Sequence, residues 1–285
     1  MIIVWLVEDV CLLEQNGMGS EDSERLSKEK EQAYQLCLSS LPGSVSADHL
    51  LDHSYSHETI VPSPFSSVNT VLMGGFYTGE VTEILGRTEA GKSWFLSAFC
   101  KHCLQTAVAV WIVDSNHSYS KGEIQQLPSD RLQLLRHAVI TDPLALLSLF
   151  QCILKEKEKP NSLSHRVIVI DSLASILAPV ISLPSSKASP ILHSVRQCLA
   201  QLAQQHVAVL CVNHLLSYNG EVRSALGEAF QSACSLRIRI DRLQHSSGEN
   251  TEIDPPRISH RLTVLKSTRV AYGTNCIYAS YTQQW

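Results

Sequence analysis

The chain has 285 residues, of which 44% are hydrophobic and 18% are charged, and its formal net charge is −4 at pH 7. This length allows one large α/β domain and a small additional unit. The acidic balance argues against a protein that coats nucleic acid over its whole surface, although a local basic groove stays possible. No apolar run approaches the roughly 18 residues of a membrane-spanning helix, so we expect no membrane role. Nine scattered cysteines favour a reducing compartment over a disulfide framework.

The first part of the chain differs in composition from the rest. Residues 1–41 contain a stretch rich in Ser, Glu, Asp and Lys and predict a small helical N-terminal segment, too short to bury a large core alone. Residues 42–64 are rich in Ser, His and Pro and predict a linker. Residues 65–285 then predict the folded core.

Two groups of residues have spacings that occur among metal ligands. His49, His53 and His57 recur every four residues and share one face if the linker is helical there, which is a spacing that can bind a metal. Polar linkers also carry histidines that bind nothing, and no cysteine cluster accompanies these. Cys100 and Cys103 lie on an expected helix with no second pair at zinc-finger spacing, so we expect both thiols in the core.

The stretch GRTEAGKS, from Gly86 to Ser93, fits the phosphate-loop pattern GxxxxGK[ST]. An apolar strand precedes it and an apolar helix follows it, which argues against an ordinary surface turn. Backbone N–H groups in such a loop point at one anion, Lys92 reaches the β and γ phosphates, and the Ser93 hydroxyl ligates Mg²⁺. The expected nucleotide-binding residues of this stretch are Gly86, Arg87, Thr88, Glu89, Ala90, Gly91, Lys92, Ser93 and Trp94.

From Gly79 onward, apolar strands alternate with helices, which is typical of a parallel sheet with crossover helices. VAVWIVD, VIVID and VAVLCVN read as buried strands. Asp142 followed by Pro143 predicts a capped helix start. The later segments ACSLRIRI, HRLTVLKST and NCIYASY alternate with period two and predict antiparallel strands at the C-terminal edge of the sheet. The predicted fold class is therefore α/β, with a mostly parallel twisted sheet and helices on both faces.

Polar residues follow the expected strands where a doubly wound sheet binds ligands. Asp171 ends VIVID and can help hold Mg²⁺, although an aspartate there can instead cap the next helix. Asp114 and Asn116 end a second strand and can face the γ-phosphate or an attacking water. Asn213 and His214 end a third strand and can sense the terminal phosphate. The side chains of the last two pairs, after the second and third strands, can alternatively form hydrogen bonds with backbone groups of the following loops.

The chain resembles the RecA-like recombinase superfamily in the order of five segments. These segments are GGFYTGEVTEILGRTEAGKS, VWIVDSN, VIVIDSLASIL, VLCVNHL and LKSTR. Within that superfamily the chain resembles the D-type paralogue of the eukaryotic strand-exchange recombinase, through YTGEVTE, VDSN, NH and the KS-R pattern. The resemblance covers about Ser63 to Ser280. It implies a RecA-like P-loop ATPase core behind a small helical segment and a linker.

This resemblance implies roles for particular residues. Lys92 and Ser93 would bind ATP and Mg²⁺, and Asp171 would be the Walker B acid that completes the Mg²⁺ site. The position of the family's catalytic glutamate holds Asn116, whose amide cannot act as a general base, so the resemblance implies weak DNA-dependent ATPase activity. His214 stands at the sensor position that holds glutamine in active recombinases, and Glu89 places a negative charge beside the phosphates.

The family's two DNA-binding loops correspond to Pro179–Pro190 and Leu215–Leu226, which contain few basic residues, chiefly Lys187 and Arg223. The resemblance implies a nuclear accessory protein of homologous recombination and double-strand break repair. Its partners would be paralogues of the B, C and X types, the main strand-exchange recombinase and single-stranded DNA. The alternatives are an interaction scaffold with a degenerate P-loop, and an unrelated P-loop small-molecule kinase, although no arginine-rich lid is evident.

Overall fold

The structure, a computed structural model, describes residues 59–117, 119, 127–157, 166–218, 221–243 and 257–281. The chain divides into two compact units, Met1–His57 and Glu58–Trp285, and all of the described residues belong to the second. The predicted helical segment 1–41, the linker as far as residue 58 and the three spaced histidines therefore lie outside the described residues.

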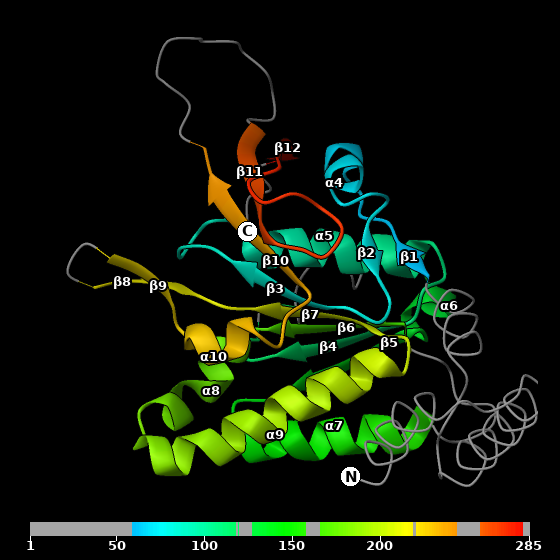
Figure 1. The fold of residues 1–285 in the computed structure, drawn as a ribbon. Helices are drawn as coiled ribbons and strands as arrows, with labels where there is room; N and C mark the ends of the chain where they lie inside the picture. The colour runs from blue at the N-terminus through cyan, green and yellow to red at the C-terminus, as the bar shows by residue number, and fades with distance from the viewer. Residues whose placement is uncertain are drawn as a thin grey trace, which may run out of the picture. The chain divides into compact units, whose positions relative to one another are not determined.

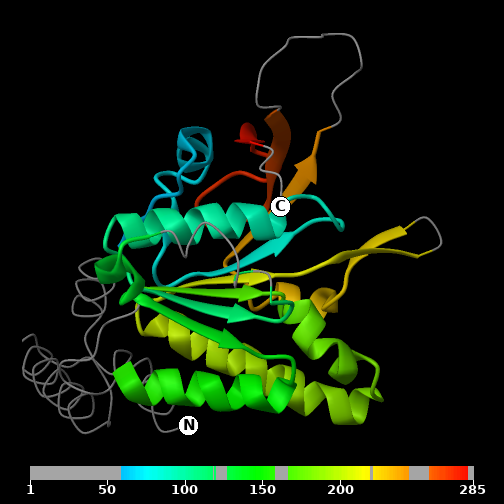
Figure 2. The same cartoon turned by 180° about the vertical axis from the view of Figure 1, so that it is seen from behind.

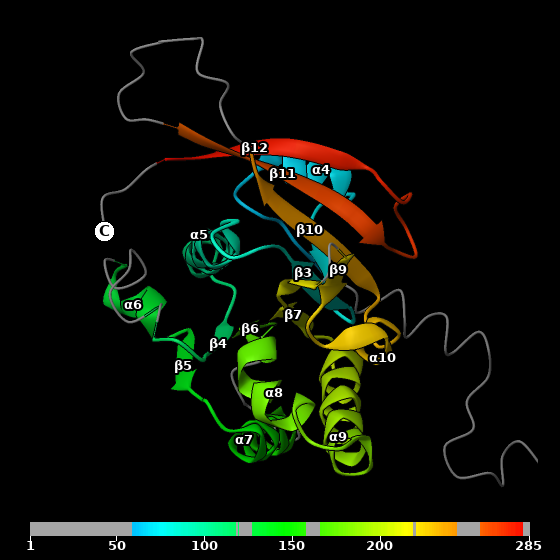
Figure 3. The same ribbon diagram turned by 90° about the vertical axis from the view of Figure 1, so that its left-hand side faces the viewer.

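A mixed sheet forms the centre of the second unit (Figure 1). Its strands are β3 (Val81–Leu85), β4 (Val110–Asp114), β5 (Leu135–Val139), β6 (Val167–Asp171), β7 (Ala208–Val212), β10 (Leu236–Arg242), β11 (Arg257–Lys266) and β12 (Asn275–Tyr281). Among the described residues the sheet has eight strands in the order β12-β11-β10-β3-β7-β6-β4-β5, and Figure 3 shows this order across the sheet. The strands from β3 to β5 in this order are all parallel to their neighbours.

The C-terminal strands extend the sheet on the other side of β3. β10 pairs in parallel with β3 and antiparallel with β11, and β11 pairs antiparallel with β12. The predicted antiparallel edge is thus confirmed for β11 and β12, while the β10 segment also continues the parallel part. The architecture is an α/β fold with a mostly parallel sheet, as predicted, and it is consistent with a RecA-like core.

Helices cover both faces of the sheet (Figure 2). One face carries α5 (Lys92–Gln105), and the other carries α7 (Pro143–Lys157), α8 (Leu173–Ile181) and α9 (Ser185–Gln204). Successive strand residues face opposite layers, so Ile168 packs in the core beside α7 to α9 while Val169 packs in the core beside α5. Because both faces are covered, β3, β6 and β7 are buried at every position, and β6 and β7 are almost entirely apolar.

Local signals place the start of α7 where the sequence predicts it. The Asp142 carboxylate accepts a hydrogen bond from the Ala145 N–H at 2.8 Å, which caps the first turn of α7, and Pro143 is its first residue. No helix of the described residues is long and apolar enough to cross a membrane. The remaining short elements are α4 (Ser66–Val71), α6 (Ser129–Leu132) and α10 (Gly227–Gln231).

Two small antiparallel sheets complete the described part of the chain. β1 (Ile60–Val61) pairs with β2 (Phe76–Tyr77), so ordered pairing begins inside the stretch that we assign to the linker from sequence. β8 (Leu215–Tyr218) and β9 (Glu221–Ser224) form a hairpin that extends from the end of the sheet in Figure 1. This hairpin is the place of the second expected DNA-binding loop.

Candidate nucleotide-binding site

The phosphate-loop stretch connects β3 to α5, as the sequence predicts. Both of its glycines lie against the C-terminal strands. A Cβ atom on Gly86 would come within 2.6 Å of the Ile240 carbonyl oxygen, and a Cβ atom on Gly91 would come within 2.5 Å of the His260 ring. Gly91 also has φ of 92°, in the left-handed region that favours glycine. Packing from behind therefore requires glycine at both ends of the loop.

Lys92 begins α5 and turns back onto the loop that precedes it. Its ammonium group donates to the carbonyl oxygens of Gly86 at 2.9 Å and Arg87 at 2.8 Å. Burial lowers the pKa of Lys92, and the nearby Asp171 carboxylate opposes that shift. Lys92 therefore forms hydrogen bonds within its own loop. To bind a nucleotide, it must replace these hydrogen bonds to carbonyl oxygens with hydrogen bonds to phosphate oxygens.

Asp171 lies at the end of β6 beside the start of α5. Its carboxylate accepts hydrogen bonds from the Ser93 hydroxyl and from the Tyr119 hydroxyl, the latter at 3.1 Å. Burial raises the pKa of Asp171, while the two hydroxyl donors act in the opposite direction. The structure therefore brings together Lys92, Ser93 and Asp171, three residues that the sequence assigns to phosphate and Mg²⁺.

Tyr119 is a site residue that the sequence analysis did not identify. It is buried, and burial together with the Asp171 charge raises the pKa of its hydroxyl, so it acts as a neutral donor to the carboxylate. The available signal was an aromatic residue five positions after Asp114, in the loop that follows a buried strand. Such a residue is usually part of the core, so its place in the sequence does not predict that its hydroxyl contacts Asp171.

Asp114 holds this loop and does not point into an open site. One carboxylate oxygen accepts the Asn116 N–H at 2.9 Å, the other accepts the Tyr119 N–H at 3.1 Å, and His137 Nε2 lies 3.4 Å from the second oxygen. The side chain is fully buried. Of the two readings for Asp114, the structure favours satisfaction of loop backbone. The Asn116 side chain is exposed at the same edge of the sheet.

Asn213 and His214 follow β7 but face different surroundings. The Asn213 amide donates to the buried Glu83 carboxylate at 2.6 Å, so of the two readings for Asn213 the structure favours the structural one. His214 Nε2 lies 2.9 Å from the Ser172 hydroxyl. Burial lowers the pKa of His214, and the Lys92 charge lowers it further.

Glu83 is the centre of a second polar cluster that the sequence did not reveal. This fully buried carboxylate forms an ion pair with the Arg237 guanidinium, which also donates to the Gln231 side chain at 3.0 Å. The cluster joins β3, immediately before the phosphate loop, to β7, α10 and β10. A glutamate inside an apolar strand is a signal of a buried pair, but its partner lies more than 150 residues away.

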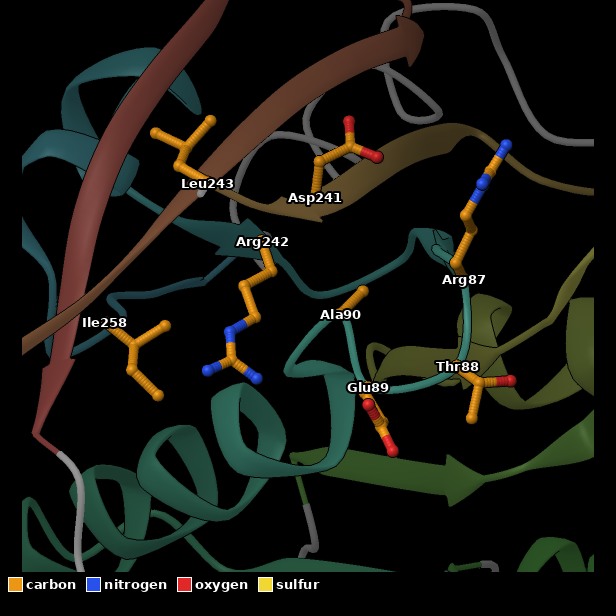
Figure 4. A pocket seen from close by; sticks show the side chains of 8 residues that line it. All are labelled: Arg87, Thr88, Glu89, Ala90, Asp241, Arg242, Leu243 and Ile258. Atoms are coloured by element: carbon orange, nitrogen blue, oxygen red, sulfur yellow. The ribbon is translucent and has the colours of Figure 1, made fainter. Parts of the chain in front are cut away.

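A pocket of about 640 Å³ lies beside the loop (Figure 4). It is lined by Arg87, Thr88, Glu89, Ala90, Asp241, Arg242, Leu243 and Ile258. Figure 4 shows Arg242 between Ile258 and the loop, while Arg87 lies on the opposite side of the loop. Arg87, Thr88 and Glu89 are exposed, Ala90 is buried and Trp94 is partly buried. Of the expected binding residues, Arg87 to Ala90 line this cavity, whereas Lys92, Asp171 and His214 are not part of its lining. Residues of β10 and β11, and Leu243 directly after β10, contribute the other half of the lining.

The other sequence expectations have mixed outcomes. Cys100 and Cys103 are fully buried in the core beside α5, as predicted. The first expected DNA-binding loop, Pro179–Pro190, is mostly helical, because α8 ends at Ile181 and α9 begins at Ser185. Lys187 lies on α9 and is exposed.

The sheet, the loop and the helix that follows it define a P-loop protein with a RecA-like arrangement. Two curated proteins that are each named DNA repair protein RAD51 homolog 4 are similar to the chain. The protein from Bos taurus is 29% identical over 206 residues, which cover 66% of this chain and 63% of that protein. The protein from Mus musculus is 28% identical over 201 residues, which cover 64% of this chain and 60% of that protein.

The chain therefore matches less than two thirds of the length of each of these relatives. No family model matches it. The similarity to RAD51 homolog 4 supports a relationship to the RecA-like recombinase paralogues, which is the family that the sequence motifs resemble.

Proposed function

We propose that this chain binds ATP with Mg²⁺ at the loop Gly86–Ser93. The observation that carries this proposal is the meeting of Lys92, Ser93 and Asp171 at the carboxyl edge of the parallel strands. An ammonium group at a helix N-terminus suits phosphate oxygens, and a hydroxyl beside a carboxylate suits Mg²⁺. When bound, Mg²⁺ supplies positive charge to the β and γ phosphates.

Nucleotide binding rearranges contacts that the chain now makes with itself. Lys92 exchanges two neutral carbonyl acceptors for charged phosphate oxygens, and hydrogen bonds between charged groups are stronger. Ser93 and Asp171 would hold the Mg²⁺ ion, and the Tyr119 hydroxyl would remain a hydrogen-bond donor to the Asp171 carboxylate. The site is therefore organised for a phosphate and a divalent cation.

The pocket beside the loop is our candidate for the nucleoside. Its volume of about 640 Å³ falls within the range of small-molecule sites, about 300–1,000 Å³. Leu243 and Ile258 offer apolar surface to a base, and the Asp241 carboxylate is an acceptor for its amino groups or for ribose hydroxyls. This composition suits a purine nucleotide such as ATP.

We propose that hydrolysis is slow and depends on DNA. Asn116 cannot take a proton from water, and Asp114 is buried with both carboxylate oxygens committed to the following loop. His214 has a lowered pKa and lies against Ser172, so it is a neutral group beside the lysine. In our proposal ATP acts mainly as a ligand that orders subunit contacts.

The similarity to RAD51 homolog 4 supports a role in DNA repair by homologous recombination. In the finer proposal the chain is a nuclear subunit of a complex with paralogues of the B, C and X types, and it assists the main strand-exchange recombinase on single-stranded DNA. Co-purification of the full chain with each paralogue tests this proposal. A chain that associates with no member of the family would contradict it.

A second candidate function is a scaffold that does not bind nucleotide. Two observations favour it, since Lys92 and Asp171 are already satisfied within the chain and the exposed Glu89 places a negative charge beside the loop. Under this reading the loop carbonyls keep the lysine permanently, and the core serves only to present interaction surfaces.

Calorimetric titration of the full chain with ATP and Mg²⁺ separates the two functions. We expect binding by the wild-type chain and a loss of about 10- to 100-fold in affinity for Lys92→Ala, because charged hydrogen bonds to phosphate are lost. Lys187→Ala is the matched control, since this exposed lysine lies on α9. Absence of binding by the wild-type chain, or equal binding by both lysine variants, would support the scaffold.

A further inference from the structure

His260, on β11, lies directly behind the phosphate loop although it is far from the loop in sequence. Its side chain is only 3% exposed. The ring stacks between two aromatic side chains, with centroid distances of 6.0 Å to Trp94 and 5.2 Å to Tyr278. Trp94 belongs to the first turn of α5, so the imidazole contacts both the loop and the helix that the loop begins.

The hydrogen bonds of His260 identify which ring nitrogen carries the proton. Nδ1 lies 3.0 Å from the Ala90 carbonyl oxygen, which can only accept, so Nδ1 is the donor. Nε2 lies 2.9 Å from the Ser280 hydroxyl, whose single proton can go either to Nε2 or to the Ile258 carbonyl oxygen at 3.3 Å. When the hydroxyl donates to Nε2, a neutral ring is satisfied at both nitrogens.

This contact determines the direction of one loop peptide group. The Ala90–Gly91 bond is trans, and the carbonyl and N–H of a trans peptide point in opposite directions. Because the Ala90 carbonyl points back to His260, the Gly91 N–H points in the opposite direction, away from His260. The close approach of Gly91 to the ring leaves little room for this peptide to rotate.

We propose that His260 is a positioning residue for nucleotide binding: it anchors the Ala90 carbonyl behind the loop and so keeps the Gly91 N–H directed at the phosphates. The inference rests on the proposed function, because it concerns the same loop. Without the anchor, the peptide can turn its carbonyl toward the phosphate site, where an oxygen lone pair repels an anion.

Two amide substitutions test this proposal, because each can place its amide group near the position of one of the two ring nitrogens. The side-chain amide of His260→Asn places a donor near the position of Nδ1, whereas that of His260→Gln reaches the position of Nε2 and loses the donor to Ala90. In titrations of the full chain with ATP and Mg²⁺, we expect His260→Gln to lose about tenfold in affinity, as for one hydrogen bond, and His260→Asn to keep most of it.

Ser280→Ala is the control variant, since it removes the partner of Nε2 and leaves the contact with Ala90 in place. We expect it to bind ATP as the wild type does. A variant that only damages packing would lower the melting temperature without distinguishing Asn from Gln. Rescue by Asn is therefore the result that a purely structural role would not produce.

A measurement on the wild-type chain keeps the proposal testable if a variant fails to fold. NMR with ¹⁵N-labelled histidine reports the tautomer, and we expect the His260 proton on Nδ1. A proton on Nε2 alone, or equal ATP affinity of the Gln variant and the wild type, would overturn the positioning role and leave ATP binding intact. If the wild-type chain does not bind ATP, the proposed function and the positioning role fail together.

Discussion

The two sides of the phosphate loop are built from different parts of the sheet. On the front, Lys92 and Ser93 at the start of α5 meet Asp171 at the end of the parallel strand β6. On the back, the C-terminal strands supply shape, since Ile240 and His260 press against the two loop glycines. The chemistry therefore comes from the parallel half, while the C-terminal half fixes the conformation in which that chemistry is presented.

The largest expected effect comes from breaking the connection between the two halves. Arg237 on β10 pairs with the fully buried Glu83 on β3, and removal of one partner from a buried ion pair typically costs about 3–5 kcal/mol. We expect Arg237→Leu to lower the free energy of unfolding by about this amount, as measured by denaturant titration, because Glu83 remains buried without its cation.

Arg239→Leu is the matched control on the same strand. Arg239 pairs with Asp241 at 2.7 Å, but its side chain is 44% exposed, and exposed pairs contribute about 1 kcal/mol or less. A similar cost for both variants would show that Glu83 does not depend on Arg237, and the two halves would then be joined by packing alone.

The second effect concerns the back of the loop. An alanine at position 91 needs a left-handed φ of 92° and places its Cβ 2.5 Å from a ring that aromatic neighbours hold in place. We expect Gly91→Ala to cost about 2–4 kcal/mol of unfolding free energy, from backbone strain and overpacking together, and to weaken ATP binding.

Gly273→Ala isolates the backbone part of this cost. Gly273 has φ of 81°, yet a Cβ there would meet nothing within 4 Å, so we expect a cost of only about 1–2 kcal/mol. The double variant Gly91→Ala/His260→Ala should recover the packing part, because the ring is gone. Equal costs for the two glycine variants would contradict the close packing of His260 on the loop.

The front of the site could largely be predicted from the sequence, and the back could not. GxxxxGK[ST] is a local pattern, and apolar strands that end in Asp171 and His214 show which residues reach the ligand edge. His260 appears in HRLTVLK as one polar residue of an alternating strand. Nothing local shows that this residue faces inward and meets Ala90, about 170 positions earlier.

The same reasoning explains Asn213 and Asp114. Each ends a buried strand, and the sequence allows either a ligand contact or a structural one. The outcome depends on partners that only the fold brings near: Glu83 for Asn213, and the N–H groups of Asn116 and Tyr119 for Asp114. A position at the end of a strand therefore predicts that a residue lies at the ligand-binding edge of the sheet, but it does not predict which group the side chain contacts.

The smallest expected effect is the pH dependence of the back of the loop. Burial lowers the pKa of His260 below its ordinary value of 6.5, the nearby Arg242 on β10 lowers it further, and the hydrogen bond to Ala90 opposes both. Tyr278 on β12, which stacks on the ring, has a pKa raised by burial and is neutral in this range. Trp94 on α5 carries no charge, so among the described residues Arg242 is the charge that acts on the ring.

The folded chain keeps the His260 ring neutral, whereas the same ring in the unfolded chain takes up a proton below about pH 6.5. The unfolded state therefore binds more protons below this pH, and the free energy of unfolding falls as the pH drops. Thermal unfolding between pH 7.5 and 5.5 should show this slope in the wild type and a shallower one in His260→Asn. Some slope should persist in the variant, because His214 also has a lowered pKa. Equal pH dependence of stability in the wild type and in His260→Asn would mean that the surroundings of His260 do not favour the neutral imidazole. A charged ring would then make the Ala90 contact equally well.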